Sequence, residues 1–210
     1  MSREIILQKV RTALRRSPGQ PSSDIPAIHP LPPGTDFETR MHQFRKAIEG
    51  LSGKFHFAGS AAAACAHITP LLEGRTAVAS NAPFLRECGI TALAGVRTGV
   101  ILEEELRNIC ASADIGITSA EYALADTGTL VMVSSAEEAR MISLLPPIHL
   151  AVIRRESILS GLDELFSLVP RPDLKTSSMV FITGSSRTAD IEQILIRGVH
   201  GPGEIHIVVI

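Results

Sequence analysis

The sequence predicts a three-layer α/β/α domain with a mostly parallel sheet and an N-terminal helical arm. From residue 54 onward, short apolar runs alternate with segments of helical periodicity, which is the rhythm of βαβ units. The later runs are β-branched and almost continuously apolar, as expected for strands covered on both faces. A proline-rich stretch over residues 17–34 separates an isolated amphipathic segment from the rest.

The composition is that of a globular protein and excludes several classes. Hydrophobic residues make up 45% of the chain and charged residues 20%, which argues against a disordered or coiled-coil protein. With a net charge of −2 and a single tyrosine, Tyr122, the chain shows no signature of nucleic-acid binding. No stretch approaches the roughly 20 apolar residues of a membrane span, and the N-terminus lacks the apolar core of a signal peptide. We therefore expect a cytoplasmic protein without a membrane span.

Residues 1–35 form the predicted arm and residues 36–210 the predicted α/β domain. Residues 2–16 place apolar side chains at helical spacing, and the prolines that follow end any helix. A helix on such a tether packs either on its own domain or on a partner subunit, so a homo-oligomer is one of the expectations.

Within the domain, the elements follow in order. A helix is expected over residues 37–51, followed by a strand at 54–58, a helix within 60–74 and a strand at 75–80. Residues 122–135 contain a turn signal and are expected to form a hairpin beside the parallel sheet. Later strands are expected at 114–118, 129–134, 149–154, 178–184 and 204–210, with helices at 102–112, 136–143, 160–168 and 188–196.

The three cysteines are expected to be buried apolar residues rather than metal ligands. Cys65, Cys88 and Cys110 lie more than twenty residues apart and form no CxxC motif. We therefore expect neither a metal site nor a redox cofactor held by this chain alone.

The first candidate site is the loop TGSSRTADIE after the strand at 178–184. A Gly/Ser loop before a helix presents free N–H groups and the positive end of the helix dipole to an anion, and an arginine adds a fork for carboxylate or phosphate. The alternative is a plain capping loop with Thr188 as the N-cap. The candidate ligand-binding residues are Gly184, Ser185, Ser186, Arg187, Thr188 and Asp190.

The second candidate is the loop GVHGPGE, residues 198–204. Its glycines allow close approach of the backbone to a ligand, and His200 is a side chain that titrates near neutral pH. Glu204 closes the loop. A structural hydrogen-bonding role for His200 is the alternative, while His149, taken as a strand-edge residue, and His206 are expected to be structural.

The third candidate is the segment GITSAEYALADTGTL, residues 116–130. Glu121 and Asp126 lie five residues apart across the predicted turn, and two convergent carboxylates can carry acid–base or nucleophilic chemistry. If the two carboxylates point apart, they cannot cooperate in either kind of chemistry. Thr127, Gly128 and Thr129 are expected to line the same ligand site or to satisfy only the turn.

Four segments in fixed order, DIGITSAEYALADTGTLVM, SLLPPIHLAVIR, FITGSSRTADIE and GVHGPGEIHIVVI, together resemble the lactate-utilisation protein C family (LutC/YkgG), the LUD domain. The resemblance spans residues 36–210. It implies the fold of ribose-phosphate isomerase, glucosamine-phosphate deaminase and CoA transferases, the NagB/RpiA/CoA transferase-like fold. One departure is Ser185, where many relatives have proline.

The resemblance implies a role in oxidising L-lactate to pyruvate together with iron–sulfur partner proteins. Because this chain lacks clustered cysteines, we expect it to be an accessory or anion-binding subunit for a small anionic metabolite, with the iron–sulfur clusters on its partners. The resemblance specifies no catalytic residue; from the residues themselves, Glu121, Asp126 and His200 are the candidates. A self-sufficient isomerase- or CoA-transferase-like enzyme using Glu121 or Asp126 is one alternative, and a scaffolding protein that docks through its arm is another.

Overall fold

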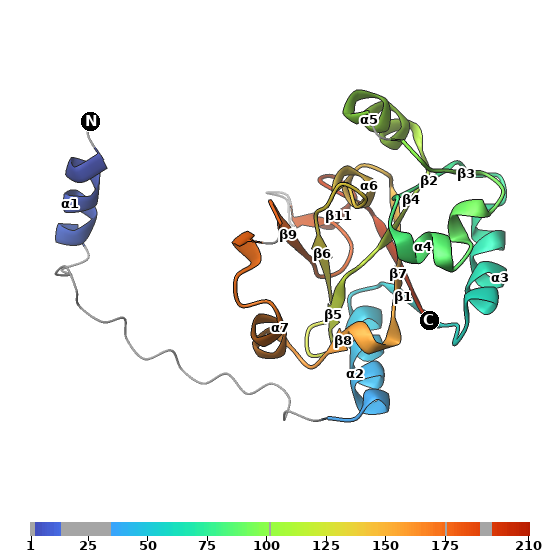
Figure 1. Ribbon diagram of the computed structural model, residues 1–210, viewed down its shortest axis with the longest axis horizontal. Helices are drawn as coiled ribbons and strands as arrows, with labels where there is room; N and C mark the ends of the chain where they lie inside the picture. The colour runs from blue at the N-terminus through green and yellow to red at the C-terminus, as the bar shows by residue number, and fades with distance from the viewer. Residues whose placement is uncertain (1–2, 14–34, 101, 175, 190–194) are drawn as a thin grey trace.

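A computed structural model describes residues 3–13, 35–100, 102–174, 176–189 and 195–210. A parallel sheet lies at the centre of the α/β body, with helices on one face and helices plus a smaller sheet on the other (Figure 1). The predicted three-layer α/β class with a mostly parallel sheet is confirmed.

The main sheet has six strands, and every neighbouring pair is parallel. Its strands, in spatial order, are β1 (Lys54–Phe57), β12 (Glu204–Val209), β7 (Ile148–Ile153), β4 (Ile115–Ser119), β2 (Ala77–Ala79) and β3 (Val96–Arg97). The central strands are buried on both faces, which explains their continuous apolar sequence.

A second, four-stranded sheet packs beside the first. Its order is β8 (Ile158–Leu159), β5 (Tyr122–Leu124), β6 (Thr129–Val133) and β9 (Met179–Ile182). β5 and β6 form the predicted hairpin, with Gly128 at φ +67° in the turn. The predicted strands at 129–134 and 178–184 therefore pair antiparallel here and lie outside the parallel sheet.

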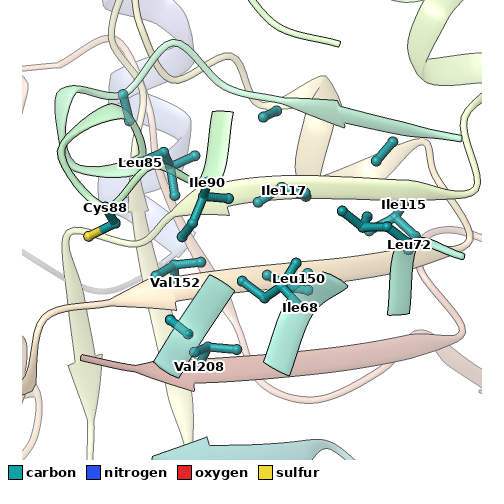
Figure 2. Close-up of a cluster of buried hydrophobic side chains, with 14 residues drawn as sticks. Ile68, Leu72, Leu85, Cys88, Ile90, Ile115, Ile117, Leu150, Val152 and Val208 are labelled. Atoms are coloured by element: carbon teal, nitrogen blue, oxygen red, sulfur yellow. The ribbon is translucent and has the colours of Figure 1, made fainter. Parts of the chain in front are cut away.

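One face of the main sheet is covered by α3 (Ala61–Leu72), α4 (Pro83–Glu87) and the 3-10 turn η1 (Ile90–Ala92). Figure 2 shows Ile68 and Leu72 of α3 with Leu85 and Ile90 over the strands. They contact Ile115, Ile117, Leu150, Val152 and Val208, which alternate along β4, β7 and β12. This alternation assigns the intervening residues to the opposite face.

The opposite face is covered by α2 (Phe37–Gly50), α5 (Glu103–Ser112), α6 (Met141–Leu144) and the second sheet. Phe44 and Ile48 of α2 pack against the second sheet and against Ile207 and Val209 of β12. α6 passes so close to β4 that a Cβ on Gly116 would lie 1.9 Å from the carbonyl oxygen of Ile142. A glycine is therefore required at that point.

The remaining described helices and 3-10 turns are α1 (Arg3–Ala13), η2 (Arg155–Ser157), α7 (Leu162–Leu168) and η3 (Pro172–Leu174). α1 matches the predicted N-terminal helix as far as it is described and buries none of its residues. Among the described residues, no helix combines the length and the hydropathy needed to cross a bilayer.

The helix predicted over 188–196 is wrong. The described parts of this segment are two antiparallel strands, β10 (Arg187–Ala189) and β11 (Leu195–Arg197). Backbone bonds from Gly198 N–H to Ser186 O (3.0 Å) and from Ser186 N–H to Pro202 O (2.8 Å) continue this pairing into the next loop. These non-local bonds override the helical spacing of the local sequence.

The helix predicted over 136–143 is confirmed only at its end, in α6. The Asn81 N–H donates a 2.8 Å bond to the carbonyl oxygen of Glu137, which a longer helix would need for its own ladder. Ser135 Oγ accepts the N–H groups of Glu137 and Glu138, at 3.1 Å each, and holds a turn there. The turn directs the carboxylate of Glu138, the second of the two glutamates, into the interior of the protein.

Candidate functional site

A pocket lies at the carboxyl edge of the parallel sheet, between β2 and β4. From β2 the chain continues to β3 at one edge of the sheet, whereas from β4 it continues by way of the second sheet to β7 on the other side. The two connections diverge at this point, which is where open α/β sheets form ligand crevices.

The pocket has a volume of about 430 Å³. Its walls come from the ends of β4 and β7, from the start of α4, and from the second sheet, where β5 and β9 begin and β6 ends. These second-sheet residues lie on the face turned away from the main sheet. The lining residues that matter for its chemistry are Ser119, Glu121, Glu137, Glu138 and Arg154. This size accommodates a small metabolite.

Glu138 is the most unusual residue of the pocket. It is only 7% exposed, and its Oε2 accepts a 2.8 Å bond from the Ser80 hydroxyl and a 3.1 Å bond from the Ser119 N–H. Its Oε1 is buried without a hydrogen-bond partner among the described residues. Burial raises the pKa of this carboxyl to about 8, and the charge of Glu121 acts in the same direction. The burial of Glu138 therefore favours its protonated, neutral form near neutral pH.

Arg154 supplies the positive charge in the pocket wall. Its Nη2 donates a 2.8 Å bond to Glu87, and its guanidinium lies 3.9 Å from the ring centroid of Phe84. Both charged partners are about half exposed, so the ion pair itself contributes little stability. The contact with the ring helps to hold the guanidinium in place, and because the side chain is about half exposed, its N–H groups that do not bond to Glu87 can reach a carboxylate.

A buried polar pair lies next to the site, on the face covered by the second sheet. His149 Nε2 lies 2.7 Å from Thr118 Oγ1, and His149 Nδ1 has no partner among the described residues. Complete burial lowers the pKa of His149 to about 4, which keeps the ring neutral. As predicted, His149 lies at the entry to a strand, where it is the second residue of β7, but only one of its two ring nitrogens has a partner among the described residues.

The structure separates the two carboxylates of the third candidate segment. Glu121 lines the pocket at the carboxyl edge, whereas Asp126 lines a different hollow together with Thr127, Thr183 and Leu51. They lie beyond opposite ends of β5. Glu121 and Asp126 therefore do not converge on one site, and a catalytic role for either would have to be played in a different hollow.

The threonines of that segment form a hydroxyl chain. Thr127 Oγ1 lies 2.8 Å from Thr129 Oγ1, which in turn lies 2.7 Å from Thr183 Oγ1. Gly128 turns tightly against α2, since a Cβ there would lie 2.9 Å from the Cβ of Ala47. These contacts support the turn-satisfying alternative, and ligand binding by these residues stays a prediction.

The loop at 184–187 is followed by strand β10 and not by the predicted helix. It therefore lacks the positive end of a helix dipole that was expected to attract an anion. Gly184 has φ +84°, and Ser185 Oγ is buried without a partner among the described residues. Arg187 donates from Nη2 to the Leu51 carbonyl and, at 3.0 Å, to Ser52 Oγ. The backbone of Thr188 lies in β10, while its side chain and all of Asp190 are outside the described residues. Anion binding at this loop stays a prediction.

The second candidate loop packs against the first. The His200 N–H donates a 3.3 Å bond to Ser186 Oγ, and the His200 side chain is exposed. Glu204 lies at the amino end of β12, where it pairs with Lys54 at 2.8 Å and with His206 at 3.3 Å. Its bond with Lys54 lowers the pKa of Glu204. Glu204 therefore lies at the edge of the sheet opposite the pocket.

Sequence reasoning missed Glu138 and Ser80. They are 58 residues apart and meet only through the fold. The local signal, two glutamates after a serine pair, is what an exposed helix start also looks like.

Comparison with known proteins agrees with this architecture. The LUD domain family model matches residues 41–210. Lactate utilization protein C of Bacillus subtilis is 38% identical over 95 residues, 43% of this chain and 39% of the relative. The protein of the same name from Halalkalibacterium halodurans is 39% identical over 103 residues, 47% of this chain and 45% of the relative. The matched segments thus span less than half the length of these relatives.

A solved structure supports the fold. A crystal structure of a DUF162 family protein from Deinococcus radiodurans matches 83% of this chain and 98% of its own, with a TM-score of 0.65 and 22% identity. At this identity the likeness concerns the fold alone. The family match extends from the second turn of α2 through β12 and contains both sheets and the pocket. The chain belongs to the LUD domain family.

Proposed function

We propose that this protein is a component of an L-lactate utilisation system and acts through a small-molecule site at the carboxyl edge of its parallel sheet. The observation that carries the proposal is the pocket between β2 and β4, which holds a buried acid and an arginine in its walls. Support for the pathway comes from relatives named Lactate utilization protein C.

The chain serves this system without a redox cluster of its own, and iron–sulfur subunits are its proposed partners. Cys88 and Cys110 are buried, and burial raises the pKa of both thiols, that of Cys110 to about 11. Metal clusters need thiolates, so these cysteines are poor ligands. The chain is then an accessory or substrate-binding subunit for a small anionic metabolite.

Growth of the host tests this role. Deletion of the gene is expected to slow growth on L-lactate and to leave growth on glucose unchanged. Normal growth of the deletion strain on L-lactate would refute the proposal.

Complementation tests the pocket. The variant Ser157→Trp places a large side chain in the pocket wall, and it should fail to restore growth. The matched control is Ser167→Trp on the exposed side of α7, away from the pocket, which should restore growth. Equal complementation by both variants would mean that this pocket is not used.

For the enzymatic alternative, Glu121 is a better candidate than Asp126. Glu121 lines the pocket that holds Glu138, whereas Asp126 lies at a different hollow. A nucleophilic carboxylate there would attack the acyl carbonyl of an acyl-CoA, which gives a glutamyl–acyl anhydride and free CoA thiolate. The thiolate would then attack the glutamyl carbonyl, leaving a covalent Glu121–CoA thioester and releasing the acyl group as a carboxylate. Incubation with several acyl-CoAs and mass spectrometry of the Glu121 peptide tests it. An unmodified peptide with every acyl-CoA would eliminate this alternative.

A further inference from the structure

Glu138 divides its two carboxyl oxygens between two tasks. Oε2 is held by the Ser80 hydroxyl and the Ser119 N–H, which fix the position of the side chain. Oε1 is equally buried but receives nothing from the described residues, and the residue lines the pocket. A buried polar atom without a partner is costly, so a ligand that bonded to it would bind with a clear advantage.

The surroundings of Glu138 favour its protonated form. Its own turn contributes Glu137, β4 is followed by Glu121 and Tyr122, and β7 is followed by Arg154. Both glutamates are exposed, and Arg154 already has Glu87 as its ionic partner. No cation among the described residues forms an ion pair with Glu138. A proton on Oε1 removes the unpaired buried charge and makes this oxygen a donor.

We infer that protonated Glu138 recognises a small 2-oxo or 2-hydroxy monocarboxylate. Its Oε1–H donates a hydrogen bond to the 2-oxo or 2-hydroxy oxygen of the ligand, and Arg154 receives the ligand's carboxylate. This inference rests on the proposed function and names the ligand class of the same pocket. The proton stays on Glu138 throughout, so binding requires no proton transfer. Two-point recognition of this kind selects molecules that carry an acceptor next to a carboxylate.

The charges of the pocket also set the strength of binding. Glu121 and Glu137 are carboxylates, so they repel an anionic ligand. Both are exposed, and solvent weakens this repulsion without abolishing it. Replacing Glu121 with glutamine is therefore expected to tighten binding of an anionic ligand severalfold.

Calorimetric titration of the full chain with pyruvate and with L-lactate tests the inference. Affinity should be constant below pH 7 and fall about tenfold per pH unit once Glu138 loses its proton, above about pH 8. Glu138→Gln keeps a donor at the same place and should bind with no such pH dependence. Glu138→Ala should bind weakly at every pH. Glu105→Gln, exposed on α5, is the control and should behave like the parent.

Two results would overturn the inference. One is an unchanged pH profile in Glu138→Gln; the other is failure of both probes to bind the parent protein at any pH. Neither result depends on growth on L-lactate, so the proposed function stands or falls separately by the deletion experiment. A ¹³C-carboxyl NMR titration gives an independent readout. It should show one glutamate with a midpoint near 8 that is lost in Glu138→Gln, and a midpoint below about 6 would also overturn the inference.

Discussion

The Ser80 hydroxyl donates a 2.8 Å hydrogen bond to Oε2 of Glu138 across 58 residues of sequence. The bond joins the carboxyl end of β2 to the turn that follows β6 of the second sheet, so it links the two sheets at the pocket. Because the acceptor is a buried acid with its other oxygen unpaired, the same contact couples folding to protonation.

Glu138 should make the protein less stable as pH rises. The carboxyl keeps its proton in the folded state up to about pH 8 but loses it in the unfolded state above about 4.5, so stability is full below the lower value and declines between the two. Urea unfolding at a series of pH values measures this decline, which should reach a few kcal/mol. In Glu138→Gln this decline should disappear. Glu137→Gln, at the exposed neighbour, should keep the parent slope, and a parent slope in Glu138→Gln would contradict the prediction.

His149 should act in the opposite direction, at lower pH. The buried ring stays neutral down to about pH 4, whereas in the unfolded state it takes up a proton below about 6.5. Stability is therefore present above 6.5 and is lost as pH falls toward 4, by about 3 kcal/mol. Chemical unfolding of His149→Gln should lack this loss, with His42→Gln on the exposed side of α2 as the control. Equal acid sensitivity in parent and His149→Gln would refute the assignment.

Much of the fold was predictable because the buried parallel strands carry their own signal. β4, β7 and β12 are buried on both faces and mostly apolar, and no exposed helix has that pattern. The failures occur where non-local hydrogen bonds decide. The segment at 188–196 has helical spacing, but its described parts are strands that pair antiparallel, and the bond between Gly198 and Ser186 continues that pairing. The turn at Glu137 is fixed by Asn81.

The candidate site was less predictable for a related reason. Glu121 was found because it lies in a segment with carboxylates and a turn, and it does line the pocket. Asp126 shares that segment but lies at another hollow, since the strand β5 between them carries them apart. Glu138 was missed because its chemistry depends on burial and on Ser80, neither of which local sequence reveals.

Gly116→Ala should be strongly destabilising. A Cβ at this position would lie 1.9 Å from the carbonyl oxygen of Ile142 and 3.0 Å from Pro146 Cγ, and the clash with backbone cannot be relieved by a rotamer change. We expect a loss of roughly 3 kcal/mol or more in the free energy of unfolding. Gly50→Ala, whose Cβ meets nothing within 4 Å, should be near neutral. A Gly116→Ala protein as stable as the Gly50→Ala protein would contradict the close packing of α6 on β4.

Arg187→Ala separates the two roles considered for this residue. In the structure the guanidinium bonds to the Leu51 carbonyl and to Ser52 Oγ, which tie β10 to the end of α2. If that is its role, thermal unfolding should show a loss of about 1–2 kcal/mol while affinity for pyruvate and L-lactate is unchanged. Arg97→Ala, at an exposed position on the edge strand β3, is the control for loss of a surface charge. Lost anion affinity with unchanged stability would instead restore the anion site predicted at this loop, since Arg187 is not in the wall of the pocket that holds Glu138.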